Sequence, residues 1–418
     1  GESIARLLEA GGADVKRLSY HGDVGLHVAK AIYGLQLMQS EQAQADTAEL
    51  ENYLGKAYSL GNQKYEDDET SQAEIDAINL KIYQQSDPKI NKLHQQGNRL
   101  SFEYFDKILD LLSISTDRRY LESEAIEPGL KLVKANTGQV FKPSQGAVVY
   151  DGAKAGLHTR VFITSKGLPT YETKDLGLTQ LKNRDFPDAN RSIIITASEQ
   201  AEYFKVMLAA LGEIDPKLAD LTQHLSHGFV SLSTGKMSSR TGNVYPAMKL
   251  LLEVKDAVHK QYPDSPVKKE VALGAVKFAF LKHRLGSDLV LDVDESISLE
   301  GNSGPYLQYA HARACSILAK AKPPTPHIKL DELDENERNL ARKISEYPEV
   351  VGKAAAELMP HHICTYLYEL AQAFNGFYET SRIVGDQREA VRLALVSSYK
   401  DVLHSGLKIL NIAAPERM

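Results

Sequence analysis

A lysine, two serines and an arginine stand close together between two glycines in residues 235–242. They follow an apolar run at residues 228–232 that is typical of a β-strand. Such a segment can close over a polyphosphate, because cations neutralise its charge, hydroxyls donate hydrogen bonds and glycines let the backbone approach. A polar surface turn is the alternative interpretation.

A tyrosine and a carboxylate, Tyr171 and Asp175, stand four residues apart after a turn. In a helix that spacing places both side chains on one face. A carboxylate can accept a guanidinium through two parallel hydrogen bonds, and a tyrosine can bond or stack beside it. Alternatively, Asp175 caps a helix or pairs with Lys182.

Gln200 follows an apolar run at residues 192–196. In open α/β sheets, ligands bind at the carboxyl ends of the strands. A glutamine amide both donates and accepts hydrogen bonds, so Gln200 is suited to orienting a polar ligand. Thr196 or Ser198 as a helix N-cap is compatible with that role.

The pattern up to about residue 245 alternates helices with short apolar strands. It predicts helices at 2–10 and around 201–211, and strands at 15–20, 147–150, 161–164 and 192–196. This order favours a doubly wound α/β sheet with parallel strands. Between about residues 35 and 130, amphipathic polar segments at 41–60 and 71–85 predict a helical insertion rather than a disordered linker.

Strand signals fade after about residue 244, and the prolines of residues 323–326 mark a loop. Two apolar stripes with helical spacing then predict a helical bundle, and most of their members are expected in its core. The stripes contain Tyr366, Leu367, Leu370, Phe374, Phe377 and Tyr378, and then Val391, Leu395, Val402, Leu403, Leu407 and Leu410.

The composition, 43% hydrophobic and 25% charged over 418 residues, is ordinary for a globular protein of two or more domains. The net charge of -6 means that a nucleic-acid partner must be held by local basic patches. Two distant cysteines, Cys315 and Cys364, support neither a disulfide framework nor a zinc knuckle and are expected to be buried thiols. No apolar run approaches the ~20 residues of a membrane span, and no signal peptide opens the chain, so we expect a cytoplasmic protein.

Taken together, these segments resemble the arginyl-tRNA synthetases, a family of class I aminoacyl-tRNA synthetases, along nearly the whole chain. Residues 236–240 resemble the family's KMSKS loop, residues 171–176 its arginine-binding segment, and residues 301–313 the opening of its anticodon-binding domain. The resemblance implies a Rossmann-like doubly wound parallel sheet in a catalytic domain at 1–245, with a helical insertion at about 35–130. A helical connector at 246–300 and an all-helical anticodon-binding domain at 301–418 would follow.

The resemblance also implies roles for individual residues. Arginine would be bound by Tyr171, Asp175 and Gln200, and ATP by Gly228, Val230, Lys236 and Met237. Catalysis would fall to Lys236, Ser238 and Arg240. The tRNA would meet Tyr306, Tyr309, Arg313, Tyr378 and Met418, since unstacked bases rest on flat side chains and arginine holds phosphates. Alternatively, these tyrosines simply belong to the core of a helical bundle.

Two departures from the family pattern limit these assignments. The family's His-x-Gly-His motif occurs nowhere in the chain, so we expect a protein truncated at its N-terminus before or at that motif, with impaired adenylation. The domain that contacts the tRNA elbow is absent too, whereas residues 414–418 match the family's terminus. Ser239 replaces the second lysine of the loop, so Lys236 receives the transition-state role and Arg240 an auxiliary one.

The resulting prediction is an ATP-dependent arginine–tRNA ligase whose partners are arginine, ATP and tRNA(Arg), acting as a monomer away from membranes. Mg²⁺ is expected to arrive with ATP rather than in a protein cage, and no zinc is expected. A cysteinyl enzyme would need a zinc-ligating cysteine set that is missing here. A non-catalytic tRNA-binding protein derived from a synthetase body is the alternative function.

Overall fold

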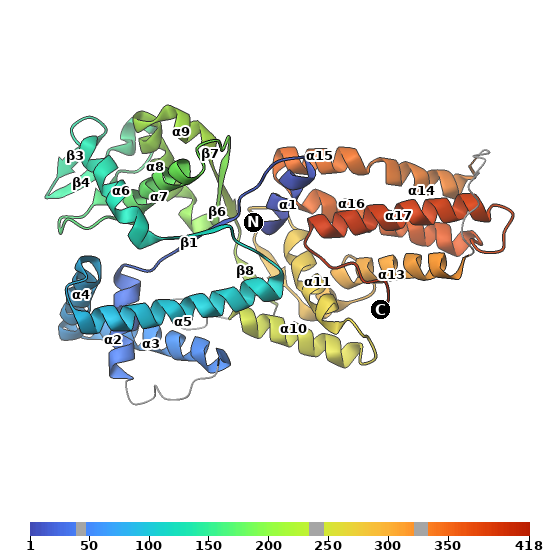
Figure 1. Ribbon diagram of the computed structural model, residues 1–418, viewed down its shortest axis with the longest axis horizontal. Helices are drawn as coiled ribbons and strands as arrows, with labels where there is room; N and C mark the ends of the chain where they lie inside the picture. Colours follow the sequence, from blue (N-terminus) through green and yellow to red (C-terminus); the bar gives the residue numbers. More distant parts are fainter. Residues whose placement is uncertain (39–46, 234–245, 322–332) are drawn as a thin grey trace. The chain divides into compact units, whose positions relative to one another are not determined.

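The computed structural model describes residues 1–38, 47–233, 246–321 and 333–418, with only the backbone of residues 47–52. These residues form two compact units (Figure 1). One consists of Lys16–Ser226, and the other combines Gly1–Val15 with His227–Met418. Each unit is described by itself below. The Pro-rich segment at 323–326 and the loop at 236–240 lie outside the described residues.

The unit Lys16–Ser226 alternates strands and helices along most of its length. In chain order it contains β1 (Leu18–His21), α2 (Leu26–Leu37), α3 (Thr47–Asp67), α4 (Glu69–Gln84), α5 (Pro88–Leu112), β2 (Arg118–Leu121), α6 (Glu122–Ala135), β3 (Phe141–Ser144), β4 (Ala147–Tyr150), β5 (Arg160–Ile163), α7 (Tyr171–Asp185), β6 (Ser192–Ala197), α8 (Ala201–Ile214), α9 (Pro216–Leu221) and β7 (Thr222–His227). Two short 3₁₀ helices, η1 (Gly152–Ala155) and η2 (Ser198–Gln200), join them.

Strands β1 and β2 pair in parallel, although helices α2 to α5 separate them in the sequence. Aspartates begin two of these helices, since Asp68 and Asp87 accept hydrogen bonds from the first backbone amides of α4 and α5. The range 35–130 therefore holds helices, as its spacing indicates, but also β2 and the start of α6. The arginines of β2 hide that strand from an apolar pattern.

Strands β4 and β5 are present where the sequence predicts them, but their direction differs from the prediction. They form an antiparallel sheet with β3 instead of joining a parallel one. The physical reason is the connection between them, which holds only a 3₁₀ turn. Parallel neighbours need a crossover of a dozen or more residues. Strands β6 and β7 form a separate pair.

Helices α6 and α7 pack with unusually close backbones because two glycines lie at their contact. A Cβ atom on Gly129 would come within 2.0 Å of the Thr173 carbonyl oxygen, and one on Gly177 within 2.0 Å of the Ala125 carbonyl oxygen. Larger residues at either position would push the helices apart. The contact therefore fixes α7, the helix that carries Tyr171 and Asp175, against the helix that follows β2.

The second unit is mainly helical. It contains α1 (Glu2–Ala10), β8 (Val230–Leu232), α10 (Ala247–Gln261), α11 (Lys268–Leu281), β9 (Leu289–Leu291), α12 (Val293–Ile297), α13 (Gly304–Lys320), α14 (Glu335–Ser345), α15 (Tyr347–Glu357), α16 (His361–Thr380) and α17 (Glu389–Ile409). Strand β9, which has only three residues and was missed in the sequence, pairs in parallel with β8.

Helices α13, α14, α16 and α17 run side by side around one core (Figure 1). Both predicted apolar stripes contribute to it, with Phe374 stacked 3.9 Å from Tyr399 between ring centres. Cys364 is buried as expected, whereas Cys315 is only half-buried. A helical bundle is therefore confirmed for this part of the chain.

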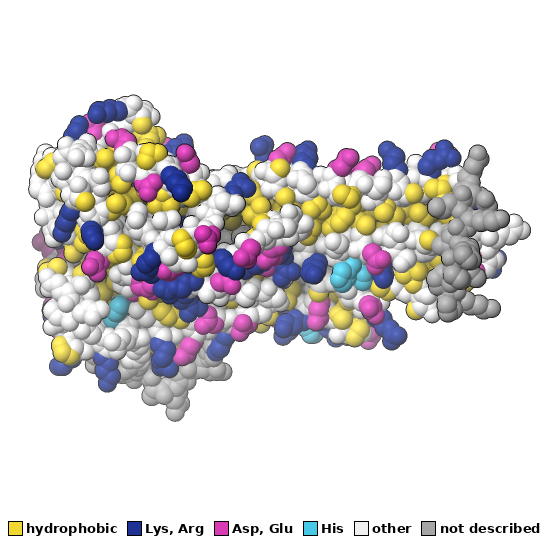
Figure 2. Space-filling view, turned by 45° about the horizontal axis from the view of Figure 1, so that its top comes forward, with side chains coloured by type: hydrophobic (Ala, Val, Ile, Leu, Met, Phe, Trp, Pro, Cys, Tyr) yellow, Lys and Arg dark blue, Asp and Glu magenta, His cyan; other side chains and the backbone are white. Residues whose placement is uncertain are grey.

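Charged side chains of both signs are interspersed over the face shown in Figure 2. This agrees with a net charge of -6 and leaves attraction for an anionic partner to local groups. Among the helices in the described ranges, none is both long and apolar enough to cross a membrane.

Candidate functional site

Asp175 lies inside α7 and is buried. In the part of the chain that the structure describes, no hydrogen bond or ion pair reaches its carboxylate. Burial, and then the charge of Glu122, raise the pKa of Asp175 to about 7. Asp175 does not cap α7, because the N-cap of that helix is Thr170. Lys182 donates to the Ser192 hydroxyl, but its charge still acts on Asp175 and opposes the rise of the Asp175 pKa.

The other carboxylates near Asp175 already have partners. Glu122 forms a buried ion pair with Lys174. Asp23 accepts hydrogen bonds from the Ser123 amide at 2.9 Å and the Ser123 hydroxyl at 2.6 Å. Asp175 is thus the one of these three that can accept a bidentate cation without losing an existing bond. Sequence reasoning missed Glu122, which stands about fifty residues before α7.

Tyr171 is the first residue of α7, and 56% of it is exposed. Lys174 lies one turn further on, with its ammonium 4.4 Å from the centre of the Tyr171 ring. Tyr171 and Asp175 are thus one turn apart at the start of α7, with Lys174 against the Tyr171 ring. A tyrosine so placed can close over a ligand that reaches Asp175.

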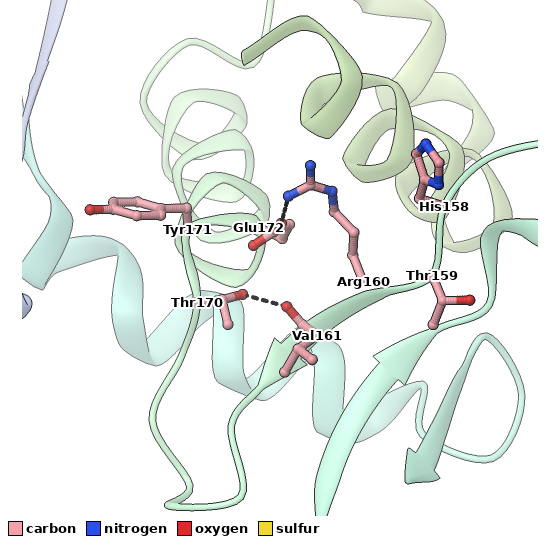
Figure 3. Close-up of a pocket in the computed structure, with 7 residues that line it drawn as sticks. All are labelled: His158, Thr159, Arg160, Val161, Thr170, Tyr171 and Glu172. Atoms are coloured by element: carbon pink, nitrogen blue, oxygen red, sulfur yellow. Dashed lines mark hydrogen bonds and ion pairs between the residues drawn. The ribbon is translucent and has the colours of Figure 1, made fainter. Parts of the chain in front are cut away.

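An open pocket of ≈ 500 Å³ lies beside β5, and Tyr171 is one of its lining residues (Figure 3). Within it Arg160 reaches Glu172, with 3.0 Å between Nη1 and Oε1, while Tyr171 points away from Arg160 and His158. Asp175 and Gln200 are not among its lining residues. The pocket is thus adjacent to the Asp175 site and distinct from it.

Gln200 ends the 3₁₀ helix η2 directly after β6 and is exposed. Among the described contacts, none joins it to Asp175 or Tyr171. Its neighbourhood is ordered by Thr196, whose hydroxyl lies 2.8 Å from Nε2 of His224. The His224 ring stacks on Phe204 at 4.1 Å, and burial lowers its pKa. The side chain of Gln200 is therefore free to turn toward a ligand.

Gly228 and Val230 lie at the start of β8, in the other unit. A Cβ atom on Gly228 would lie 2.2 Å from the carbonyl oxygen of Ser287, so the passing backbone requires glycine here. Asp288 accepts a hydrogen bond from the Phe229 amide at 2.7 Å and fixes this turn. The requirement is structural and leaves a role toward ATP untested. Lys236, Met237, Ser238 and Arg240 lie outside the described residues.

Three of the residues predicted to contact tRNA form one cluster on α13 and α16. The Arg313 guanidinium lies 4.9 Å from the centre of the Tyr309 ring and 5.5 Å from that of Tyr378. Arg313 donates to Asn375 at 3.1 Å, and Asn375 donates in turn to the Tyr306 hydroxyl at 2.8 Å. Tyr309 and Tyr378 are 39% and 43% exposed, so they are not core residues.

Met418 is half-buried, and no described contact joins it to this cluster. The segment before it is held at backbone carbonyls by α13. Gln308 donates to Ala413 at 2.9 Å, and Nδ1 of His311 lies 2.9 Å from the Pro415 oxygen. Sequence reasoning noted these two residues only as part of a family motif. Their contacts give them a structural role in positioning the C-terminal segment.

No group of three or more His, Cys, Asp or Glu side chains that could hold a metal ion occurs within the described ranges. The Asp175 site offers one carboxylate to a ligand and no metal-binding set.

Comparison with known proteins places these features in one class. The family model for the catalytic domain of class I tRNA synthetases (R) matches residues 1–293, and that for the DALR anticodon binding domain matches residues 307–418. A methionyl-tRNA synthetase of Mycobacterium tuberculosis shares the fold with a TM-score of 0.57 at 12% identity. The fold is that of a class I aminoacyl-tRNA synthetase.

Individual relatives narrow the class. An arginine–tRNA ligase of Bdellovibrio bacteriovorus is 31% identical, over 100% of this chain and 75% of its own length. One of Treponema denticola is 30% identical with the same coverage. The Thermus thermophilus arginyl-tRNA synthetase superposes with a TM-score of 0.85 at 27% identity, covering 100% of this chain and 78% of that one. The chain belongs to the arginyl-tRNA synthetase family.

Proposed function

We propose that this protein is an arginine–tRNA ligase. The carboxylate of arginine attacks the α-phosphate of ATP, which yields arginyl-adenylate and releases pyrophosphate. A ribose hydroxyl at the 3′ end of tRNA(Arg) then takes the arginyl group and releases AMP. The assignment of arginine as the substrate rests on Asp175 in a chain of this family. Asp175 is a buried carboxylate without a partner in the described structure. A module that only binds tRNA has no use for such a costly group.

The residues divide the work between binding and charge stabilisation. Asp175 holds the guanidinium, Tyr171 covers it and Gln200 orients the rest of the amino acid. Gly228, Val230 and Met237 seat ATP. Catalysis of this kind needs positioned donors rather than a covalent intermediate.

Three residues of the ATP loop are proposed to interact with the phosphates. Lys236 stabilises the developing charge on the phosphate, with Ser238 and Arg240 beside it. Mg²⁺ enters with ATP through phosphate oxygens and water.

The remaining proposals also rest on membership of this family. Residues 1–245 form the catalytic domain, 246–300 the connector and 301–418 the anticodon-binding domain. A monomeric, cytoplasmic enzyme without zinc is proposed with them. Light scattering tests the monomer, and elemental analysis of the purified protein tests the absence of zinc.

A calorimetric titration with arginine tests the proposed substrate. We expect saturable binding of arginine and none of citrulline, because citrulline replaces the guanidinium by a neutral urea of nearly the same shape. Equal binding of both would contradict a charged contact with Asp175. Absence of any arginine binding, with and without tRNA, would refute the proposed amino acid.

The 418-residue chain contains no His-x-Gly-His, and we therefore expect little activation of arginine. Arginine-dependent exchange of pyrophosphate into ATP, measured with tRNA present, should run ~100-fold or more below that of the Bdellovibrio bacteriovorus relative. Loss of positioned transition-state donors has effects of about this size. Exchange at the relative's rate would show that the motif is dispensable here.

The cluster around Arg313 is proposed to bind the anticodon loop. Arg313→Ala should weaken the binding of tRNA(Arg), measured by filter binding, by roughly 10-fold, since stacking contributes ~1–3 kcal/mol per base. Arg313→Lys should recover only part of the loss, because it restores the charge and not the planar fork. Arg342→Ala, an exposed arginine of α14, is the matched control and should change binding about twofold at most. Equal losses in Arg313→Ala and Arg342→Ala would reduce the cluster to a general charge effect.

A further inference from the structure

The hydroxyl of Tyr20 is shut off from solvent, yet no described residue forms a hydrogen bond with it. Tyr20 lies in β1, opposite Tyr120 of β2. It packs against the core cluster that contains Ala125 of α6 and Leu178 and Leu181 of α7. A buried polar atom without a partner is rare in folded proteins and costs stability. Ser19 and His21, on either side of it in β1, each have such an atom as well. We therefore consider β1 a candidate for contact with a bound ligand.

The surroundings of this hydroxyl show which ligand it faces. After burial, the charges of Asp175, Glu122 and Asp23, in that order, keep the pKa of Tyr20 far above its usual value. Glu122 is occupied by Lys174, and Asp23 by Ser123. Asp175 alone is without a partner in the described structure. Tyr20 packs against the cluster that contains Leu178, one turn after Asp175 on α7. One oxygen from β1 and one from α7, each without a described partner, therefore lie near the same part of the core.

A guanidinium matches such a pair of oxygens. It is planar and offers five N–H donors in a fixed fork, but no acceptor. A carboxylate can accept two of these donors, which leaves others to be satisfied away from water. A tyrosine that stays protonated at every physiological pH can accept one more without adding charge.

We propose that Tyr20 is a specificity-determining residue of the amino-acid pocket, whose hydroxyl accepts a hydrogen bond from the guanidinium held by Asp175. The inference rests on the proposed function, since it takes arginine as the ligand. It adds to that function a contact from β1, about 150 residues before α7. A primary ammonium, as in lysine, is not planar and does not reach both oxygens with the same geometry.

Tyr20→Phe tests the proposal because it removes only the hydroxyl. We expect two opposite effects. Arginine binding measured by calorimetry falls about 10-fold, the size of one hydrogen bond to a charged group. The thermal midpoint of the arginine-free protein stays the same or rises, since an unsatisfied buried hydroxyl has gone. A tyrosine with only a structural role would lower the midpoint and leave arginine affinity unchanged.

Tyr83→Phe is the matched control. The pKa of Tyr83 is also raised by burial and by Glu122, but Asp175 is not among the charges that act on it. Its removal should leave arginine affinity within twofold. Wild-type affinity in Tyr20→Phe, with the parent chain binding arginine normally, would overturn the role of Tyr20 alone. If the parent chain binds no arginine, the proposed function fails and not merely this contact.

Discussion

Asp175→Asn should lower the affinity for arginine by 10-fold or more. The amide keeps the shape of the carboxylate but loses the charge that a guanidinium needs, and a hydrogen bond to a charged group contributes ~1.5–3 kcal/mol. Calorimetric titration of arginine measures the loss directly. Asp185→Asn, at the end of the same helix, is the control, because Asp185 bonds to Tyr120 and Arg184 and should leave affinity within twofold. An unchanged affinity in Asp175→Asn would remove Asp175 from the pocket.

The same substitution should stabilise the protein without arginine. Burial raises the pKa of Asp175 from 3.8 to about 7, so the fold prefers the protonated form. The stability linked to that proton is present below pH ~4 and is lost as the pH rises to about 7. Asparagine carries no such penalty. Asp175→Asn should therefore be more stable than the parent at pH 8, by roughly 2–4 kcal/mol, and nearly equal to it at pH 4.

Arginine binding in the parent protein should depend on pH in the opposite sense. Guanidinium binds the ionised carboxylate, and with a pKa of about 7 only ~10% of Asp175 is ionised at pH 6. Affinity should rise about 10-fold between pH 6 and pH 8, with protons released on binding. Calorimetry in buffers of different ionisation enthalpy counts those protons. An arginine affinity that does not change between pH 6 and pH 8 would mean that Asp175 is already ionised at pH 6 before arginine binds.

The sequence predicted which side chains of α7 could bind a guanidinium, but not which residues from other segments surround them. A tyrosine and an aspartate four residues apart were enough to predict one helix face, because that relation is local. The occupation of Glu122 by Lys174 and the position of Tyr20 were not predictable, since those residues come from segments 50 to 150 residues away. Burial of a charged residue leaves no signature in a single sequence.

The fold shows the same division between local and distant information. Helices with caps and periodic stripes, such as α4 and α16, lie close to where the sequence predicts them. Strand β9 was missed because three residues are too few for a period, and its pairing with β8 joins positions 59 residues apart. The direction of β4 and β5 depended on a short connection that an apolar pattern does not report.

Glu337→Ala should cause a large loss of stability in the helical bundle. Glu337 is fully buried at the first turn of α14 and accepts hydrogen bonds from Nε of Arg388 at 2.8 Å and Nε of Arg392 at 2.9 Å. Its carboxylate also closes a capping box with Asp334. Alanine leaves both guanidinium groups without their main partner, and breaking such a buried set costs ~3–5 kcal/mol. Thermal unfolding should show a midpoint lower by about 10 °C.

The pH dependence of that loss distinguishes the charge network from simple packing. The hydrogen bonds that Glu337 accepts from Arg388, and then those from Arg392, lower the pKa of Glu337 from 4.5 to about 2. The stabilisation is therefore present above pH ~4.5 and disappears as the pH falls toward 2. The parent and Glu337→Ala should converge in stability near pH 2, whereas a packing defect would persist there. Glu335→Ala, exposed on the same turn, should change the midpoint by about 2 °C at most. Arg392 also donates to the carbonyl of Arg382, which follows the last turn of α16, where Tyr378 lies. Loss of Glu337 should therefore disturb the surroundings of Tyr378, and Glu337→Ala should weaken tRNA binding as well.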